Sequence, residues 1–174
     1  MSRTGWIVAL GCVAALVPRA GQALGTLPAP CSAPEYRQFD FWVGDWTVVD
    51  TSGTPAGTNR VTHEFGGCVV QEHWAGTDGS RGTSLNTYDA STKRWHQTWV
   101  DNNGAILLLE GGVADGKMVL MGETVGARTG KAYLNRITWQ REGSPNKVRQ
   151  VWDMSTDGGA TWKNLFNGLY SRQR

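Results

Sequence analysis

The chain has 174 residues, of which 40% are hydrophobic, 17 are Lys or Arg and 15 are Asp or Glu. This length and composition fit one globular domain with a sizeable core. Arg3 and Arg19 carry the whole positive excess, so the chain beyond residue 23 holds 15 basic and 15 acidic residues. A neutral domain lacks the basic surface that nucleic acids and anionic membranes attract, and we expect neither as a partner.

The first 23 residues are organised like a cleaved secretory signal. Arg3 precedes an uncharged apolar stretch over residues 6–17, Pro18 ends it, and Gly21-Gln22-Ala23 offers small residues for cleavage. The stretch is too short for a permanent membrane helix, so we expect export to the periplasm or the exterior without stable membrane insertion. A lipobox ending at a lipidated Cys12 is the weaker alternative, because Ala9 stands where Leu is usual.

Residues 24–38 are predicted to form an extended arm and residues 39–174 the folded domain. After cleavage two cysteines remain, Cys31 in the arm and Cys68 in the domain. An even number of cysteines in an oxidising compartment favours a disulfide over two buried thiols. We therefore predict a Cys31–Cys68 bond that ties the arm to a hairpin.

From Trp46 onward, short runs of alternating apolar and polar residues are separated by Gly, Asn and Asp. Such runs predict β-strands, and ten are expected, at residues 46–50, 58–65, 68–76, 83–89, 94–101, 105–113, 117–123, 133–141, 147–154 and 161–172. The connections are of hairpin length, so the simplest topology is an antiparallel up-and-down meander. Closure into a barrel would remove its edges, and the predicted fold is an all-β barrel with a helical turn or two at residues 35–43.

The string Phe39-Asp40-Phe41-Trp42-Val43-Gly44-Asp45-Trp46 resembles the start of lipocalin-like (calycin) barrels, whose first strand opens with Gly-x-Trp. Together with Gly67-Cys68 and Gln71-Glu72-His73-Trp74, it is similar to a family of exported bacterial proteins without assigned function. The resemblance covers most of the mature chain. It implies that Trp46 closes one barrel end beneath a basic residue near the end of the chain, Arg172 or Arg174.

Hairpin geometry predicts which side chains face the interior, because side chains alternate along a strand. If Gly66-Gly67 is a two-residue loop, one inward face holds Val61, His63, Phe65, Cys68, Val70, Glu72 and Trp74. Pairing Tyr88 with Trp95 gives a second inward face with Ser84, Asn86, Tyr88, Trp95, Gln97, Trp99 and Asp101, and leaves His96 outside. Pairing Val100 with Ala105 sets Gln97 opposite Leu108 and turns Glu110 inward, and a last face holds Ile137, Trp139, Gln150, Trp152 and Met154.

The predicted interior is rich in Trp and Tyr but also holds several polar side chains. In a solid core each unpaired polar group costs about 1–3 kcal/mol, whereas a wet cavity can use such groups. We therefore predict a ligand site lined by Glu72, Trp74, Asn86, Tyr88, Trp95, Gln97, Trp99, Gln150 and Trp152. The alternative is that a bulge reverses the register and turns several of these side chains to solvent.

The leading hypothesis is an exported protein that binds a small amphipathic or apolar molecule. A lyase or isomerase on the same barrel is the alternative, with His63, Glu72 and Glu110 as candidate catalytic residues, because burial raises the pKa of a carboxyl group. An envelope interaction domain without a ligand is a third possibility. No His or Cys spacing suits a metal, and nitrobindin-like haem barrels use a late histidine whereas His96 is the last here. We expect no metal and no cofactor.

The stretch from Ser155 to Trp162 matches the Ser-x-Asp-x-Gly-x-Thr-Trp pattern of the Asp-box. In sialidase-like propellers this pattern recurs in every blade as a hairpin turn remote from the active site. A single copy predicts a well-formed turn in which Asp157 accepts hydrogen bonds from backbone amides, and gives no support to glycosidase activity.

Overall fold

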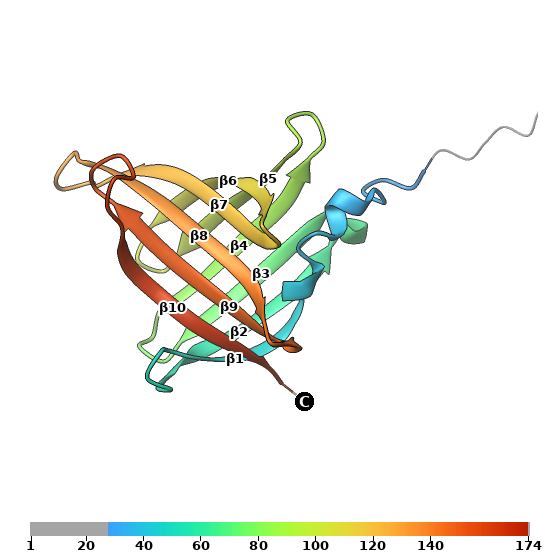
Figure 1. Cartoon of the computed structure of the whole chain (residues 1–174), viewed down its shortest axis with the longest axis horizontal. Helices are drawn as coiled ribbons and strands as arrows, with labels where there is room; N and C mark the ends of the chain where they lie inside the picture. The colour runs from blue at the N-terminus through green and yellow to red at the C-terminus, as the bar shows by residue number, and fades with distance from the viewer. Residues whose placement is uncertain (1–27, 174) are drawn as a thin grey trace, which may run out of the picture.

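A computed structural model describes residues 28–173, which form ten antiparallel strands closed into one barrel (Figure 1). Each strand pairs with its neighbours in sequence, and β1 pairs with β10 to complete the ring. The strands are β1 Gly44–Val49, β2 Pro55–Glu64, β3 Val69–Gly76, β4 Arg81–Asp89, β5 Arg94–Asp101, β6 Ile106–Ala114, β7 Lys117–Val125, β8 Ala132–Glu142, β9 Ser144–Ser155 and β10 Lys163–Arg172. The predicted all-β up-and-down barrel is confirmed, with strand ends within three residues of those expected.

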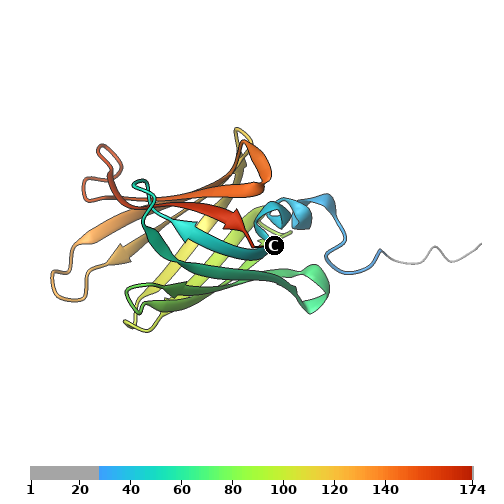
Figure 2. The same cartoon turned by 90° about the horizontal axis from the view of Figure 1, so that it is seen from below.

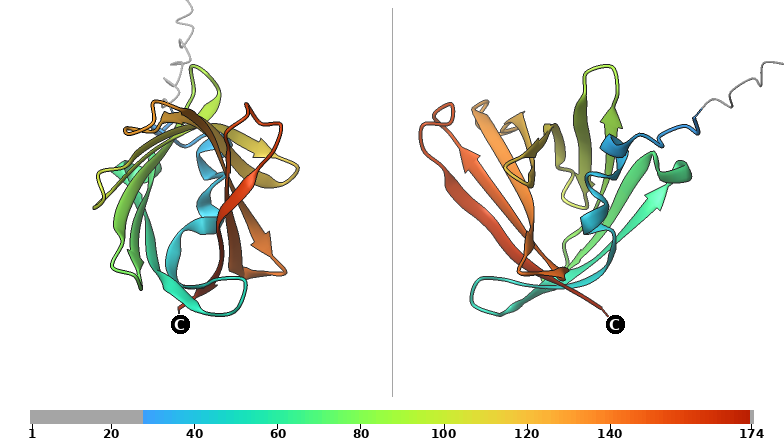
Figure 3. Two further views of the ribbon diagram at one scale, coloured as in Figure 1. Left: turned by 90° about the vertical axis from the view of Figure 1, so that its left-hand side faces the viewer. Right: turned by 45° about the vertical axis from the view of Figure 1, so that its right-hand side comes forward.

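The segment before β1 crosses one end of the barrel, which we call the closed end. It contains two 3-10 helices, η1 Pro34–Arg37 and η2 Asp40–Trp42. Figure 2 shows this segment at the barrel end, and Figure 3 (left) shows it through the ring of strands from the opposite, open end. Within residues 28–173 no helix is long and apolar enough to cross a membrane.

An aromatic cluster fills the closed end. Phe39 stacks on Trp42 with ring centroids 4.9 Å apart, and makes edge contacts with Trp95 at 5.6 Å and Trp139 at 5.1 Å. These four side chains are no more than 1% exposed. Burial of several aromatic rings in direct contact makes this end a solid core.

Trp46 and Arg172 close the same end, as the lipocalin resemblance implied. Trp46 Nε1 donates a hydrogen bond to the Trp42 carbonyl at 2.8 Å, and the Arg172 guanidinium lies 4.4 Å from the Trp46 ring centroid. Gly44 has a φ of 148°, and a Cβ there would lie 2.0 Å from Arg172 Nη1. The motif glycine therefore makes room for the guanidinium. Arg174, the other candidate, lies outside the described residues.

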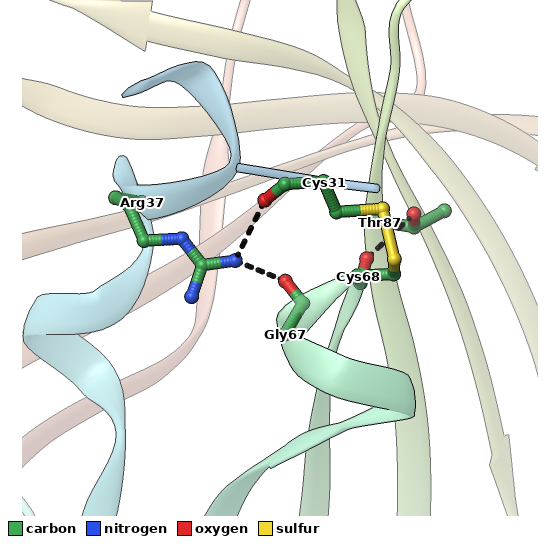
Figure 4. The surroundings of a disulfide bond; sticks show 5 residues. All are labelled: Cys31, Arg37, Gly67, Cys68 and Thr87. Atoms are coloured by element: carbon green, nitrogen blue, oxygen red, sulfur yellow. Dashed lines mark hydrogen bonds between the residues drawn. A yellow bond between two sulfur atoms is a disulfide. The ribbon is translucent and has the colours of Figure 1, made fainter. Parts of the chain in front are cut away.

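The predicted disulfide is present and fastens the N-terminal segment to the β2–β3 turn (Figure 4). Cys31 and Cys68 have Cα atoms 5.1 Å apart. The Arg37 guanidinium donates to the carbonyl oxygens of Cys31 and Gly67, and Thr87 Oγ1 donates to the Cys68 carbonyl at 2.9 Å. Covalent and hydrogen bonds thus hold the segment that fills the closed end.

The β2–β3 connection differs from the predicted two-residue loop. The pairing of His63 with Val70 is as expected, but residues 65–67 form the 3-10 helix η3 Phe65–Gly67. Phe65 has a φ of 51° and is 78% exposed, so the prediction that it faces inward was wrong. Cys68 leaves the ladder to reach Cys31. The loop is two residues longer than predicted, because one residue leaves each strand. The register of the two strands, and therefore the face to which each side chain points, is unchanged.

The β5–β6 register is shifted by one residue from the prediction. Val100 pairs with Ile106 rather than Ala105, because Asp101 Oδ1 accepts the amides of Asn103 and Ala105 at 2.9 and 3.0 Å and closes a three-residue loop. Gly104, with φ 78°, supplies the left-handed residue of such a loop. Asp101 is a turn residue and not, as predicted, an interior one.

The shifted register exchanges the two faces of β6. Leu107 and Leu109 are buried, at 6% and 0% exposure, whereas Leu108 is 53% exposed and the side chain of Glu110 is 54% exposed. The placement of Glu110 in the interior was therefore wrong. A one-residue slip turns every side chain of a strand to the other face, which is what happened here.

The Asp-box forms the predicted turn between β9 and β10. Asp157 Oδ1 accepts the Thr161 amide at 2.8 Å and the Ser155 hydroxyl at 2.7 Å. Hydrogen bonds from Thr161 and Ser155 lower the pKa of Asp157 to about 2. The carboxylate organises the loop, and Arg136 stacks 4.0 Å over the Trp162 ring beside it.

Candidate ligand cavity

A cavity of about 400 Å³ occupies the barrel interior toward the open end. This volume lies within the range of about 300–1,000 Å³ that is typical of small-molecule sites. Six aromatic side chains line it: Trp74, Trp99, Trp139, Trp152, Phe166 and Tyr170. At the rim are residues of the β3–β4 turn, Thr77, Asp78 and Ser80.

The indole rings of Trp74 and Trp99 lie against glycine residues of neighbouring strands. A Cβ at Gly57 would lie 2.9 Å from Trp74 Cη2, and a Cβ at Gly82 would lie 2.2 Å from Trp99 Cη2. Each glycine therefore provides space that a larger residue would fill. Trp74 also meets Phe166 edge-on at 5.8 Å. Small residues in the wall thus let large rings line the cavity without closing it.

Glu72 is the buried carboxylate of the cavity, with 4% exposure. It lies in the middle of β3 between Val61 of β2 and Ser84 of β4. Asn59 Nδ2 donates to its Oε1 at 2.7 Å, and Ser84 Oγ donates to its Oε2 at 2.7 Å. Desolvation raises the pKa of Glu72 to about 7, and these two hydrogen bonds oppose that rise.

A chain of hydrogen bonds leads to Glu72 and has a defined direction. Asn86 Nδ2 donates to the Val70 carbonyl at 2.9 Å, so Asn86 Oδ1 is the acceptor for Gln97 Nε2 at 2.7 Å. Ser84 Oγ receives Asn86 Nδ2 at 3.0 Å and lies 3.5 Å from Gln97 Nε2. A hydroxyl surrounded by donors must direct its own proton elsewhere, and here it points to Glu72 Oε2. The network therefore presents Glu72 with donors.

Tyr170 and Gln150 complete the polar part of the cavity. The Tyr170 hydroxyl donates to Gln150 Oε1 and lies 3.5 Å from Asn59 Nδ2. Burial raises the pKa of Tyr170 well above its usual value, and the neighbouring Glu72 raises it further. Tyr170 is therefore a neutral hydrogen-bonding group in the physiological pH range.

Six of the nine predicted ligand-binding residues line this cavity, namely Glu72, Trp74, Gln97, Trp99, Gln150 and Trp152. The other three lie elsewhere. Asn86 is fully buried behind Gln97, Trp95 belongs to the aromatic cluster of the closed end, and Tyr88 packs edge-on against Tyr36 at 5.3 Å. Alternation along a strand predicted which side chains face the interior. It could not predict which of them lie in the solid core of the closed end and which line the cavity.

The candidate catalytic residues are not brought together. His63 Nε2 lies 3.2 Å from Asp40 Oδ1, beside η2, and does not line the cavity. Glu110 is on the outer face, with its Oε2 3.2 Å from Arg94 Nη1. His96, predicted to be external, hydrogen-bonds to Thr98 on that face at 2.9 Å. Only Glu72 remains in the interior, and no histidine among the described residues lines the cavity.

Several cavity residues were not predicted as ligand-binding residues. Trp139 was expected to face inward but not at the ligand, and Phe166 and Tyr170 were not considered. Asn59, which does not line the cavity but donates to Glu72, was not considered either. Strand alternation in β10 contained the missing signal, because Phe166, Gly168 and Tyr170 are spaced two positions apart and therefore share one face. Within the described part of the chain, no group of three His, Cys, Asp or Glu side chains is placed to hold a metal ion.

Comparison with known proteins does not place the chain in a family. No protein-family model matches it, and no match to a curated protein was found. The chemistry of the cavity is therefore the basis for a functional proposal.

Proposed function

We propose that this protein is an exported binding protein that holds a small amphipathic molecule in the open half of its barrel. The observation that carries the proposal is the cavity of about 400 Å³, with aromatic walls and a buried polar cluster around Glu72. At about 30 Å³ per molecule, that space would hold roughly a dozen waters, so a ligand of comparable size fits.

The cavity has the composition of a ligand site rather than of a packing defect. Voids in protein cores are few and rarely larger than a water molecule, and cavities that stay empty are apolar. Here Gly57 and Gly82 stand under the rings of Trp74 and Trp99, so the wall itself is shaped around them. Polar side chains at one place and aromatic rings elsewhere suit a ligand with one polar end.

The proposal of export is supported by the Cys31–Cys68 disulfide, because such bonds persist in oxidising compartments. The predicted signal segment at residues 1–23 lies outside the described residues. The enzyme alternative required an interior histidine beside a carboxylate. Neither His63 nor Glu110 lines the cavity, and a binding function accounts for Glu72 equally well.

The test uses N-phenyl-1-naphthylamine, an uncharged dye that fluoresces in apolar surroundings. We expect saturable dye binding to the folded protein, with quenching of Trp fluorescence because four indoles line the cavity. Ala56→Phe places a ring at the rim and should weaken dye binding at least tenfold. Thr58→Phe is the matched control: a β-bulge at Ala56 interrupts the alternation of β2, so Thr58 is exposed on the outer face, and its replacement should leave dye binding unchanged.

Two outcomes would contradict the binding function. A folded protein that takes up no dye would favour an interaction domain with no ligand. Equal dye binding by Ala56→Phe and Thr58→Phe would place the dye on the outer surface of the barrel rather than in the cavity.

A further inference from the structure

The charges of the cavity are one-sided. Among the described residues that line it, Glu72 and Asp78 are acidic, and none is Lys, Arg or His. Hydrogen bonds from the Ser80 hydroxyl and amide lower the pKa of Asp78, so this rim residue is ionised at neutral pH. Arg81, whose charge also contributes to the lowered pKa of Asp78, directs its Nη1 to the carbonyls of Gly76 and Ser80 and does not line the cavity. All the ionisable side chains of the lining that can carry charge near neutral pH are therefore acidic.

Glu72 has hydrogen-bond partners but no counter-charge. Its two donors, the Asn59 amide and the Ser84 hydroxyl, are neutral, and each occupies one lone pair of a different carboxylate oxygen. A carboxylate oxygen can accept more than one hydrogen bond, so both retain capacity toward the cavity. Buried charges in proteins are normally paired, and the cavity lining offers the ionised form of Glu72 no cationic side chain.

The aromatic residues surround the space from two sides of the barrel. Trp74 and Trp99 come from β3 and β5, whereas Trp139, Trp152 and Phe166 come from β8, β9 and β10. Indole rings attract a cation that lies within about 6 Å of the ring centroid, and such rings are the usual means of binding quaternary ammonium groups. An anionic ligand would meet repulsion from Glu72, and a purely apolar one would leave this carboxylate without solvent or a counter-charge.

We propose that the cavity binds a small organic cation, an amine or quaternary ammonium with an apolar body, whose charge lies between Glu72 and the indole rings. This inference rests on the proposed binding function and specifies its ligand. Glu72 and the aromatic rings together favour the positively charged group of the ligand. Its apolar body occupies the space toward Leu107 and Ile137.

Ionisation of Glu72 gives the proposal a pH signature. With a pKa of about 7, much of Glu72 is protonated in the empty cavity below neutral pH, and a bound cation would favour the ionised form. The affinity for a cation should therefore rise between pH 6 and 8. Around Glu72, Tyr170 has a pKa raised above its usual value and Asp78 a lowered one, so neither changes charge in this interval.

The experiment compares two probes of the same shape in competition with N-phenyl-1-naphthylamine. Benzyltrimethylammonium carries a permanent charge, and neopentylbenzene is its uncharged carbon isostere. We expect the cation to displace the dye at least tenfold more strongly at pH 8, with an advantage that shrinks at pH 6. The affinity of neopentylbenzene should not depend on pH.

Glu72→Gln keeps the shape and removes the charge, so it should abolish most of the advantage of benzyltrimethylammonium and its pH dependence. Glu110→Gln, on the outer face, is the matched control and should behave as wild type. Equal competition by the two probes, or a Glu72→Gln variant that keeps the preference, would overturn the cation proposal while dye binding upholds the binding function. If Glu72→Gln fails to fold, the pH dependence of the wild-type preference decides, and a preference that is flat from pH 6 to 8 would overturn it.

Discussion

The two ends of the barrel use tryptophan to opposite effect. At the closed end, Trp42, Trp46 and Trp95 are at most 1% exposed and pack with Phe39 into a solid cluster. At the open end, Trp74 and Trp99 are only partly buried and border a cavity of about 400 Å³. The difference between the ends is the inserted segment that carries Phe39 and Trp42, which has no counterpart at the open end within residues 28–173.

This difference shows how a barrel of this width reaches a stable core. Eight strands enclose an interior that side chains can just fill, and ten strands enclose more. Here a separate piece of chain supplies the missing volume at one end, fastened by the Cys31–Cys68 bond. Where no such piece enters, large aromatic rings line the space without filling it.

Loss of a tryptophan should cost far more at the closed end than at the open end. Trp46→Ala should lower the free energy of unfolding by about 3–5 kcal/mol, the usual range for a buried Trp. Trp99→Ala should cost roughly 1–2 kcal/mol, because its ring already borders empty space. Urea melts of both variants provide the measurement. Similar losses at the two sites would mean that the open end is as solid as the closed one.

Removal of the disulfide should loosen the closed end and leave the cavity in place. Because the two cysteines are 37 positions apart in the sequence, the Cys31→Ser/Cys68→Ser variant should lose about 2–4 kcal/mol of stability. Thermal melts with and without reductant measure this loss, and the double variant should no longer respond to reductant. Below its melting transition the double variant should bind the dye with wild-type affinity. A loss of affinity would show that the cavity depends on the segment that fills the closed end.

The buried carboxylate at the open end should make stability depend on pH. Because the pKa of Glu72 is raised to about 7, its contribution to stability is full below the pKa of the unfolded chain and is lost as the pH rises through 7. From pH 5 to 8 this loss amounts to roughly 2–3 kcal/mol. Glu72→Gln should abolish this part of the pH dependence in urea melts, and the exposed Glu110→Gln should retain it. Parallel pH profiles for Glu72→Gln and wild type would show that Glu72 is not desolvated.

The smallest expected effect is at Gln97, between the polar network and the cavity. Gln97→Leu adds apolar surface to the wall and should strengthen binding of N-phenyl-1-naphthylamine by about 1 kcal/mol. It also leaves Asn86 Oδ1 without its donor, so stability should fall by about 1–3 kcal/mol. Asn86→Leu is the matched control, because it disrupts the same network behind the cavity wall and should not strengthen dye binding. A gain in stability without a gain in affinity for Gln97→Leu would contradict the placement of this side chain at the cavity.

Local patterns were enough to predict much of the barrel. The pairs Tyr88–Trp95, Asn86–Gln97 and Ser84–Trp99 follow from one hairpin and the alternation of its strands. The disulfide followed from the two cysteines that remain beyond a segment predicted to be a cleaved export signal. The closure of the barrel end followed from the resemblance of Gly44-Asp45-Trp46 to the lipocalin motif, and Arg172 occupies the expected place.

Turns were the weakest part of the prediction, because loop length depends on side chains that act on the backbone. Asp101 fixes the conformation of its loop by accepting two backbone amide hydrogen bonds. The resulting register places Glu110 and Leu108 on the outer face, opposite to the face predicted. Phe65 adopts a left-handed conformation that its residue type does not suggest. A pattern of alternation has no means of detecting such local hydrogen bonds, and one misjudged residue is enough to turn a whole strand over.

The sequence by itself determined that the chain forms ten strands, which faces of most of them are buried, and which cysteines can pair, because these depend on neighbours along the chain. Only the tertiary structure decided which inward side chains meet solid core and which meet open space. That distinction depends on where residues 34–43 enter the barrel, and on closure of the ring at β1, which brings Tyr170 of β10 within 3.5 Å of Asn59 of β2. Such contacts join strands distant in sequence, and volume inside a barrel is a property of the closed ring rather than of any one segment.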